Sequence, residues 1–141
     1  NLNTTGAVLS PFDSYQLIRG LKTLALRMER STENAKKVVE FLKGHPAVKE
    51  VLYTGKGGMV SFKVSHQEKI PTILNHLQVL TFAESLGGVE SLITYPTTQT
   101  HADIPAEVRH SYGLTDDLLR LSIGIEDARD LIEDLEQALA R

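Results

Sequence analysis

One stripe of apolar residues with helical spacing constrains the first third of this 141-residue chain more than any other feature. The stripe recurs in steps of three and four residues, through Ile18, Leu21, Ala25, Met28, Thr32, Ala35, Val39 and Leu42. Ser10 and Pro11 are suited to begin a helix, and Gly44 followed by Pro46 is suited to end one. The pattern predicts one continuous helix from Pro11 to Lys43, roughly 50 Å long at about 1.5 Å per residue. A small domain cannot cover such a rod, so we expect its first half to pack on something else; the alternative is a coiled coil.

The rest of the chain alternates between strand and helix patterns. Period-two runs predict strands at Val48–Tyr53, Met59–Val64, Val79–Ala83, Ser91–Thr94 and Leu118–Ile123. Helices are expected from Pro71 to Leu77, from Pro105 to Tyr112, and after a cap at Asp127. These elements predict an α+β sandwich, with a small, mostly antiparallel sheet and helices on one face. We expect residues 1–43 to form a lead-in and a long interdomain helix, and residues 44–141 to form a small C-terminal domain.

The composition excludes several classes of protein. The chain has no cysteine, which excludes a disulfide framework and a thiolate zinc site. Its 15 Lys and Arg residues are scattered among 18 Asp and Glu residues, for a formal net charge of -3, so nucleic acid is not an expected partner. No apolar run reaches the roughly 18 to 20 residues of a membrane span, and the first residues lack a signal-peptide pattern. We therefore expect a soluble, cytoplasmic protein with no membrane partner.

Arg120 stands out because it lies in the middle of a predicted strand, on the same face as Leu118 and Ser122. A guanidinium on such a strand face needs an anion to balance its charge. One interpretation is a bidentate clamp for a carboxylate. An internal salt bridge or a solvent-facing edge position agrees with the spacing equally well, and the sequence leaves the choice open.

Two predicted loops contain further candidate ligand-binding residues. Glu84–Gly88 offers backbone N–H groups, a hydroxyl and a carboxylate for a small polar ligand, although a plain turn is the simpler interpretation. Tyr95–Ile104 is a long polar stretch that includes a hydroxyl-rich segment, and loops of this length are often functional. No metal is expected, because the histidines are dispersed. The chain also lacks a phosphate-binding glycine motif and a GxSxG nucleophile motif.

Five blocks, in order along nearly the whole chain, together resemble the pyridoxal-phosphate enzymes of cysteine and methionine metabolism. They are SPFDSY at 10–15, RGLKTL at 19–24, AESLGGVESL at 83–92, THA at 100–102 and LRLSIGIED at 119–127. Within that family the chain is most similar to the C-terminal third of cystathionine gamma-synthases and O-acetylhomoserine thiol-lyases. The resemblance implies the small C-terminal domain of a fold-type I enzyme, joined to a large cofactor domain by a long helix.

The resemblance also implies roles for individual residues, with pyridoxal phosphate as the cofactor of the parent enzyme. The arginine of the LRLSIG block grips the substrate alpha-carboxylate in the family, and here that residue is Arg120. The serine of the ESLGG block, Ser85, is expected beside the cofactor lysine and the substrate. Glu84 is associated with the distal end of homoserine-type substrates, and Thr100 is expected to line the same pocket. Asn3 matches a polar position near the cofactor in some members.

One departure from the family pattern limits what the chain does alone. The family's Schiff-base lysine lies upstream of the SPFD block, and no lysine precedes Lys22 here. We therefore expect the large domain to be absent and the isolated chain, with no catalytic residue of its own, to be inactive and to bind no cofactor covalently. The expected parent is a homo-oligomeric enzyme of methionine biosynthesis that joins an O-acyl-homoserine to cysteine or sulfide by gamma-replacement. The alternatives are a cystathionine gamma- or beta-lyase domain, or a non-catalytic module for amino-acid binding or oligomerisation.

Overall fold

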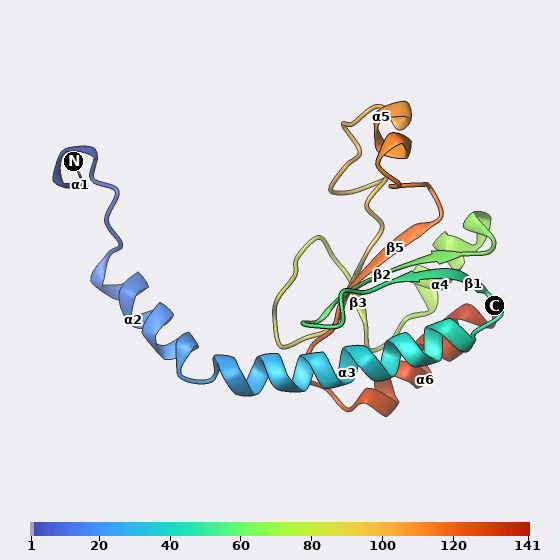
Figure 1. The fold of residues 1–141 in the computed structure, drawn as a ribbon, viewed down its shortest axis with the longest axis horizontal. Coiled ribbons are helices and arrows are strands. Elements are labelled where there is room, and N and C mark those ends of the chain that lie inside the picture. The colour runs from blue at the N-terminus through green and yellow to red at the C-terminus, as the bar shows by residue number, and fades with distance from the viewer. Residues whose placement is uncertain (1) are drawn as a thin grey trace.

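A helical arm leads into a layer of helices packed against a five-stranded sheet (Figure 1). The computed structural model describes residues 2–141, with side chains from Thr4 onward. The helices are α1 (Leu2–Thr5), α2 (Pro11–Leu21), α3 (Leu24–Gly44), α4 (Ile70–His76), α5 (Ala106–Ser111) and α6 (Ala128–Leu139), with a 3-10 turn η1 at Gln67–Lys69. The strands are β1 (Val48–Leu52), β2 (Met59–Val64), β3 (Thr81–Phe82), β4 (Leu92–Thr94) and β5 (Leu118–Ser122). Among these residues no helix is both long and apolar enough to cross a membrane.

The sheet has β5 at its centre, in the order β1-β2-β5-β4-β3. The β1–β2, β2–β5 and β5–β4 pairs are antiparallel, and only the short β3–β4 pair is parallel. The predicted α+β class with a mostly antiparallel sheet is therefore confirmed.

The two faces of the sheet differ sharply. Leu119 and Leu121 of β5 are fully buried, together with Phe62 of β2. This face packs against α3, α4 and α6, which supply the other half of the hydrophobic core. Because side chains alternate along a strand, Arg120 belongs to the opposite face. Loops and α5 lie on that side, well away from α3 and α6 (Figure 1).

The prediction of one continuous helix is wrong at Lys22 and Thr23, where α2 ends and α3 begins. The Arg27 guanidinium donates to the carbonyl oxygen of Gly20 at 2.7 Å and to Thr23 Oγ1 at 3.3 Å. A carbonyl at the end of α2 is thus satisfied by a side chain instead of by the next helical N–H. The apolar stripe runs through this break unchanged, so the pattern alone could not show it.

Both predicted helix caps are confirmed. The backbone N–H of Asp13 donates to Ser10 Oγ at 3.1 Å at the start of α2. The backbone N–H of Arg129 donates to the Asp127 carboxylate at 2.9 Å at the start of α6. The Arg129 guanidinium also binds this carboxylate, and its hydrogen bond holds the pKa of Asp127 well below the usual range.

The predicted strand Val79–Ala83 is much shorter than expected. Only Thr81–Phe82 pairs as a strand. The buried carboxylate of Asp134 on α6 accepts the backbone N–H groups of residues 78–80 at 2.8 to 2.9 Å. These three donors are therefore used by a helix side chain and are not available to the sheet.

Candidate functional site

Arg120 is a half-buried residue at the centre of the open face of the sheet. It lies between Ser61 of β2 and Thr94 of β4 in the strand register. Its guanidinium lies 3.5 Å from Thr94 Oγ1 and, within residues 4–141, forms no ion pair. The position is neither at the sheet edge nor part of an internal salt bridge. Of the interpretations left open by the sequence, a site for an external anion agrees best with this geometry.

The loop that carries Glu84 and Ser85 is held over this open face by two side chains. At its start, Thr94 Oγ1 donates to the carbonyl oxygen of Ala83 at 2.8 Å. Further on, the backbone N–H of Gly87 donates to Ser122 Oγ at 2.9 Å. Gly87 has a φ of 76°, in the left-handed region that favours glycine.

Glu84 and Ser85 lie between these two anchor points, and both are exposed. Thr94 and Ser122 flank Arg120, so the loop crosses the sheet next to the guanidinium. In the part of the chain that is described, neither residue is hydrogen-bonded to Arg120. The structure therefore anchors the loop at Thr94 and Ser122, the two residues that flank Arg120.

The far end of the loop is fixed by a buried network that the sequence did not reveal. The backbone N–H and the hydroxyl of Ser91 donate to the Glu126 carboxylate at 2.5 and 2.8 Å. Ser91 Oγ in turn accepts the backbone N–H of Gly124 at 2.8 Å. Asn34 of α3 donates to the carbonyl oxygens of Gly124 and Glu126. Ser91 and Glu126 lie in two of the shared sequence blocks, which was the only available signal for them.

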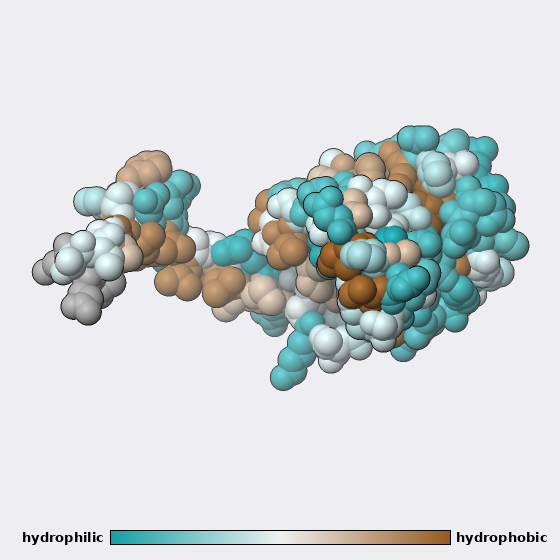
Figure 2. Space-filling model, turned by 90° about the horizontal axis from the view of Figure 1, so that it is seen from above, coloured by the Kyte–Doolittle hydropathy of each residue, from teal (hydrophilic) through white to brown (hydrophobic). Residues whose placement is uncertain are grey.

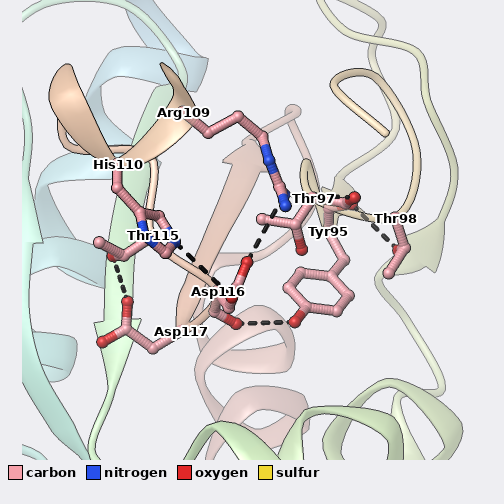
Figure 3. Close-up of polar contacts among 8 residues, drawn as sticks. All are labelled: Tyr95, Thr97, Thr98, Arg109, His110, Thr115, Asp116 and Asp117. Atoms are coloured by element: carbon pink, nitrogen blue, oxygen red, sulfur yellow. Dashed lines mark hydrogen bonds and ion pairs between the residues drawn. The ribbon is translucent and has the colours of Figure 1, made fainter. Parts of the chain in front are cut away.

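Thr100 lies on a separate, turn-rich loop beside the sheet. Its hydroxyl is 2.7 Å from His101 Nδ1, and the side chain is exposed. Within the described residues no hydrogen bond joins Thr100 to Arg120 or to Ser85. Figure 3 shows how the start of this loop is tied to the head of β5, where the Tyr95 hydroxyl points to Asp116. The side chain of Asn3 lies outside the described part of the chain.

Asp117, the acidic residue nearest to Arg120 along the chain, is paired with a cation. Asp117 pairs with Lys49 of β1 and accepts a hydrogen bond from the Thr115 hydroxyl. Burial tends to raise the pKa of Asp117, but these hydrogen bonds and the Lys49 charge outweigh burial and hold the pKa below its usual value. Asp117 is thus ionised and neutralised locally, which leaves the charge of Arg120 available to a ligand.

A cavity of about 180 Å³ lies between the loop and α3, next to the candidate site. Its lining includes Met28 and Ser31 of α3, Leu86 and Gly87 of the loop, and Ser122. Among the described residues no group of three or more His, Asp or Glu side chains is placed to hold a metal ion. A guanidinium that forms no ion pair within residues 4–141 is suited to bind a small molecule that carries a carboxylate.

The sequence model of the family described as Cys/Met metabolism PLP-dependent enzymes matches residues 1–140. The chain belongs to this family, which depends on pyridoxal phosphate and includes the enzymes of transsulfuration.

Among its relatives is the cystathionine gamma-synthase of Haemophilus influenzae, 56% identical over 138 residues that cover 98% of this chain and 37% of that protein. The cystathionine gamma-synthase/O-acetylhomoserine (thiol)-lyase of Bacillus subtilis is 54% identical, with 99% and 37% covered. The cystathionine gamma-lyase of B. subtilis is 48% identical, with 97% and 40% covered. The chain therefore spans about two fifths of the length of these relatives.

Solved structures show the same fold. The cystathionine gamma-lyase of Lactobacillus plantarum, complexed with L-serine, matches with a TM-score of 0.87 at 41% identity, over 98% of this chain and 40% of that one. A Campylobacter jejuni protein assigned as an O-acetylhomoserine (thiol)-lyase matches with a TM-score of 0.92 at 34% identity, over 99% and 38%. The latter carries an N'-pyridoxyl-lysine-5'-monophosphate.

Proposed function

We propose that this chain forms the substrate-carboxylate side of the active site in a transsulfuration enzyme of the cystathionine gamma-synthase type. The parent reaction is gamma-replacement, in which cysteine or sulfide displaces the acyl group of an O-acyl-homoserine. Two relatives with synthase names, at 56% and 54% identity, support this choice over the lyases at 48% and 44%. Because the chain spans about two fifths of these proteins, the reaction belongs to a larger protein.

The observation that carries the proposal is the guanidinium of Arg120 on the open face, which forms no ion pair within residues 4–141. A planar guanidinium binds a carboxylate through two parallel hydrogen bonds, which fix the orientation of an amino acid as well as its position. Ser85 and Glu84, on the loop anchored by Thr94 and Ser122, then lie over the bound amino acid. We assign Ser85 to the reacting end of the substrate and Glu84 to its distal end, with Thr100 at the rim.

The residues present do not fit the anchoring of the cofactor itself. Pyridoxal phosphate supplies the electron sink that chemistry at the beta and gamma carbons requires, and it is held through a lysine amine. On β2, β4 and β5 the only lysine is Lys63, whose ammonium pairs with Glu50 Oε2 at 2.8 Å. The loop at residues 84–91 contains none. We therefore assign cofactor anchoring to the remainder of the protein and give this chain the role of binding and orienting substrate.

We also propose that residues 1–43 connect the small domain of residues 44–141 to that remainder. No residue of α2 is buried, and its large apolar side chains are exposed, with Phe12 at 69%, Ile18 at 58% and Leu21 at 64%. Figure 2 shows apolar surface along the arm, and a groove of about 560 Å³ lies where α2 meets α3. An apolar surface of this kind needs a partner in water.

A chimera tests the proposed reaction. The matching 138 residues of the H. influenzae cystathionine gamma-synthase are replaced by this chain, and products are measured with an O-acyl-homoserine and cysteine. We expect a new thioether and a free carboxylic acid. Release of a keto acid and ammonia without thioether would instead assign the chain to a lyase. A folded chimera that binds pyridoxal phosphate and does neither would contradict the proposal.

The same chimera tests the role of the arm. We expect I18E to lower the thermal midpoint of the chimera while it leaves the midpoint of the isolated chain unchanged, because Ile18 is 58% exposed in this chain. An equal loss of stability in both proteins would show that α2 does not pack on the remainder of the enzyme.

A further inference from the structure

A second polar cluster ties the loop of residues 95–104 to the start of β5 (Figure 3). Its central residue is Arg109 of α5, whose side chain is only 12% exposed. Arg109 Nη1 donates to the carbonyl oxygen of Thr97 at 3.4 Å and lies 3.5 Å from Oδ1 of Asp116. The Tyr95 hydroxyl donates to the carbonyl oxygen of Asp116 at 2.7 Å. One guanidinium and one phenol therefore hold the loop against the residues that precede β5.

The position of these contacts along the chain connects them to the candidate site. Asp116 lies four residues before Arg120 and two residues before β5 begins. Tyr95 directly follows Thr94, the contact of the Arg120 guanidinium. Thr100 lies further along the loop. A movement of the loop away from Asp116 would change the position of Thr100 relative to Arg120.

The hydrogen bonding of this cluster is incomplete, so a contribution to stability does not by itself explain it. Arg109 Nε and Thr97 Oγ1 are both buried, and neither has a hydrogen-bond partner among the described residues. Buried polar groups without partners cost free energy, and native structures hold few of them. An apolar side chain of similar length would avoid that cost. The buried guanidinium is better explained by the geometry it imposes on the loop.

We propose that Arg109 is a positioning residue, which fixes the loop of residues 95–104 against β5 and so sets the distance between Thr100 and Arg120. The inference rests on the proposed function for its effect on substrate, but its effect on the loop is independent of any reaction. Arg109 needs no contact with substrate for this role, because it acts through Thr97 and Asp116.

Amide hydrogen exchange in this chain measures directly how often the loop of residues 95–104 opens. The loop amides of residues 98, 99, 101 and 102 donate to backbone carbonyls within the loop and report its opening. We expect R109M to speed their exchange about tenfold, which corresponds to the loss of about one charge-assisted contact. R109K should give an intermediate rate, since an ammonium reaches one acceptor but lacks the planar fork. Y95F, which removes only the hydroxyl, should speed the same amides.

Two controls define the comparison. R129M removes an arginine that is also ion-paired, to Asp127, but lies at an exposed position on α6, and it should leave loop exchange unchanged. The amide of Leu121 in the central strand should exchange at the original rate in every variant, which shows that the sheet is intact. Unchanged loop exchange in R109M would overturn the proposal, and this result does not depend on whether the chimera is active.

Kinetics in the chimera then test the consequence for substrate. We expect R109M to raise the KM of the amino-acid substrate about tenfold and to change kcat less than about threefold, with partial rescue in R109K. Faster loop exchange with an unchanged KM in an active chimera would overturn the connection to the substrate site. If an unsubstituted chimera that is folded and binds pyridoxal phosphate has no activity, the proposed function fails, and loop exchange still decides whether Arg109 fixes the loop.

Discussion

The two faces of β5 differ in the burial and polarity of their side chains, although these side chains alternate along one strand. Leu119 and Leu121 are fully buried against the helices, whereas Arg120, between them, is half-buried and has no acidic partner among residues 4–141. On the helix side both leucines belong to the hydrophobic core. On the open side the neighbours are the hydroxyls of Thr94 and Ser122, which hold a loop in place.

The difference shows that stability and binding are divided by the alternation of side chains along one strand. The core face fixes the position of the backbone, and that backbone then carries the guanidinium to the open face. A substitution on one face should therefore change one property and leave the other nearly intact. The predictions below follow from this separation, in order of decreasing effect.

Neighbouring alanine substitutions on β5 should separate the two faces most clearly. We expect L121A to lower the free energy of unfolding of this chain by about 3 kcal/mol, because it leaves a cavity in the core. R120A should change it by less than about 0.5 kcal/mol, since it removes one weak contact and no ion pair. Urea unfolding of both variants measures the difference. Similar losses would show that Arg120 is a structural residue.

Glu126 joins the two faces, and its substitution should affect the loop more than the core. In E126Q one carboxylate oxygen becomes an N–H₂ group that faces the Ser91 hydroxyl, which already accepts the Gly124 N–H. We expect a loss of about 1.5 kcal/mol in unfolding free energy, with faster exchange of the Gly87 and Ser91 amides. E133Q, at an exposed position on α6, is the matched control and should change neither. An effect limited to core amides would contradict the anchoring role.

Asp117 should give the smallest effect, and one that depends on pH. Its pKa in the folded chain lies below the ordinary value of 3.8, so its ion pair stabilises the fold fully above that value. This stability is lost as the pH falls through the lower folded-state pKa. Because Lys49 is half exposed, we expect D117N to cost about 0.5 kcal/mol at pH 7 and a smaller amount near pH 2. Unfolding at both pH values checks this, and an equal cost at both would contradict it.

Local signals in the sequence were sufficient for most elements of the fold. Ser10 and Asp127 cap their helices as expected, and the period-two runs of β1, β2 and β5 form antiparallel pairs. Two predictions were wrong, the continuous helix and the length of β3, because in each case a side chain outside the element binds its backbone. Arg27 ends α2 by binding the Gly20 carbonyl, and Asp134 takes the N–H groups that would have extended β3.

The candidate site was predictable only in part. Alternation placed Arg120 and Ser122 on one face, and the resemblance nominated Ser85, Glu84 and Thr100, whose roles stay predictions. Only the strand order shows that Arg120 is central and not at an edge. The contacts of Arg109 had no local signal in the sequence, because its acceptors at Thr97 and Asp116 are brought together only by the fold.

The central claim is that Arg120 binds the carboxylate of an amino-acid substrate. Its most direct test is competitive inhibition of the chimera by 2-aminopentanoate and by the corresponding carboxamide. The unsubstituted chimera should bind the carboxylate about 100-fold more tightly than the amide, and R120A should bind both within about threefold, while R129A behaves like the unsubstituted protein. A 100-fold preference for the carboxylate that persists in R120A would show that another residue binds it.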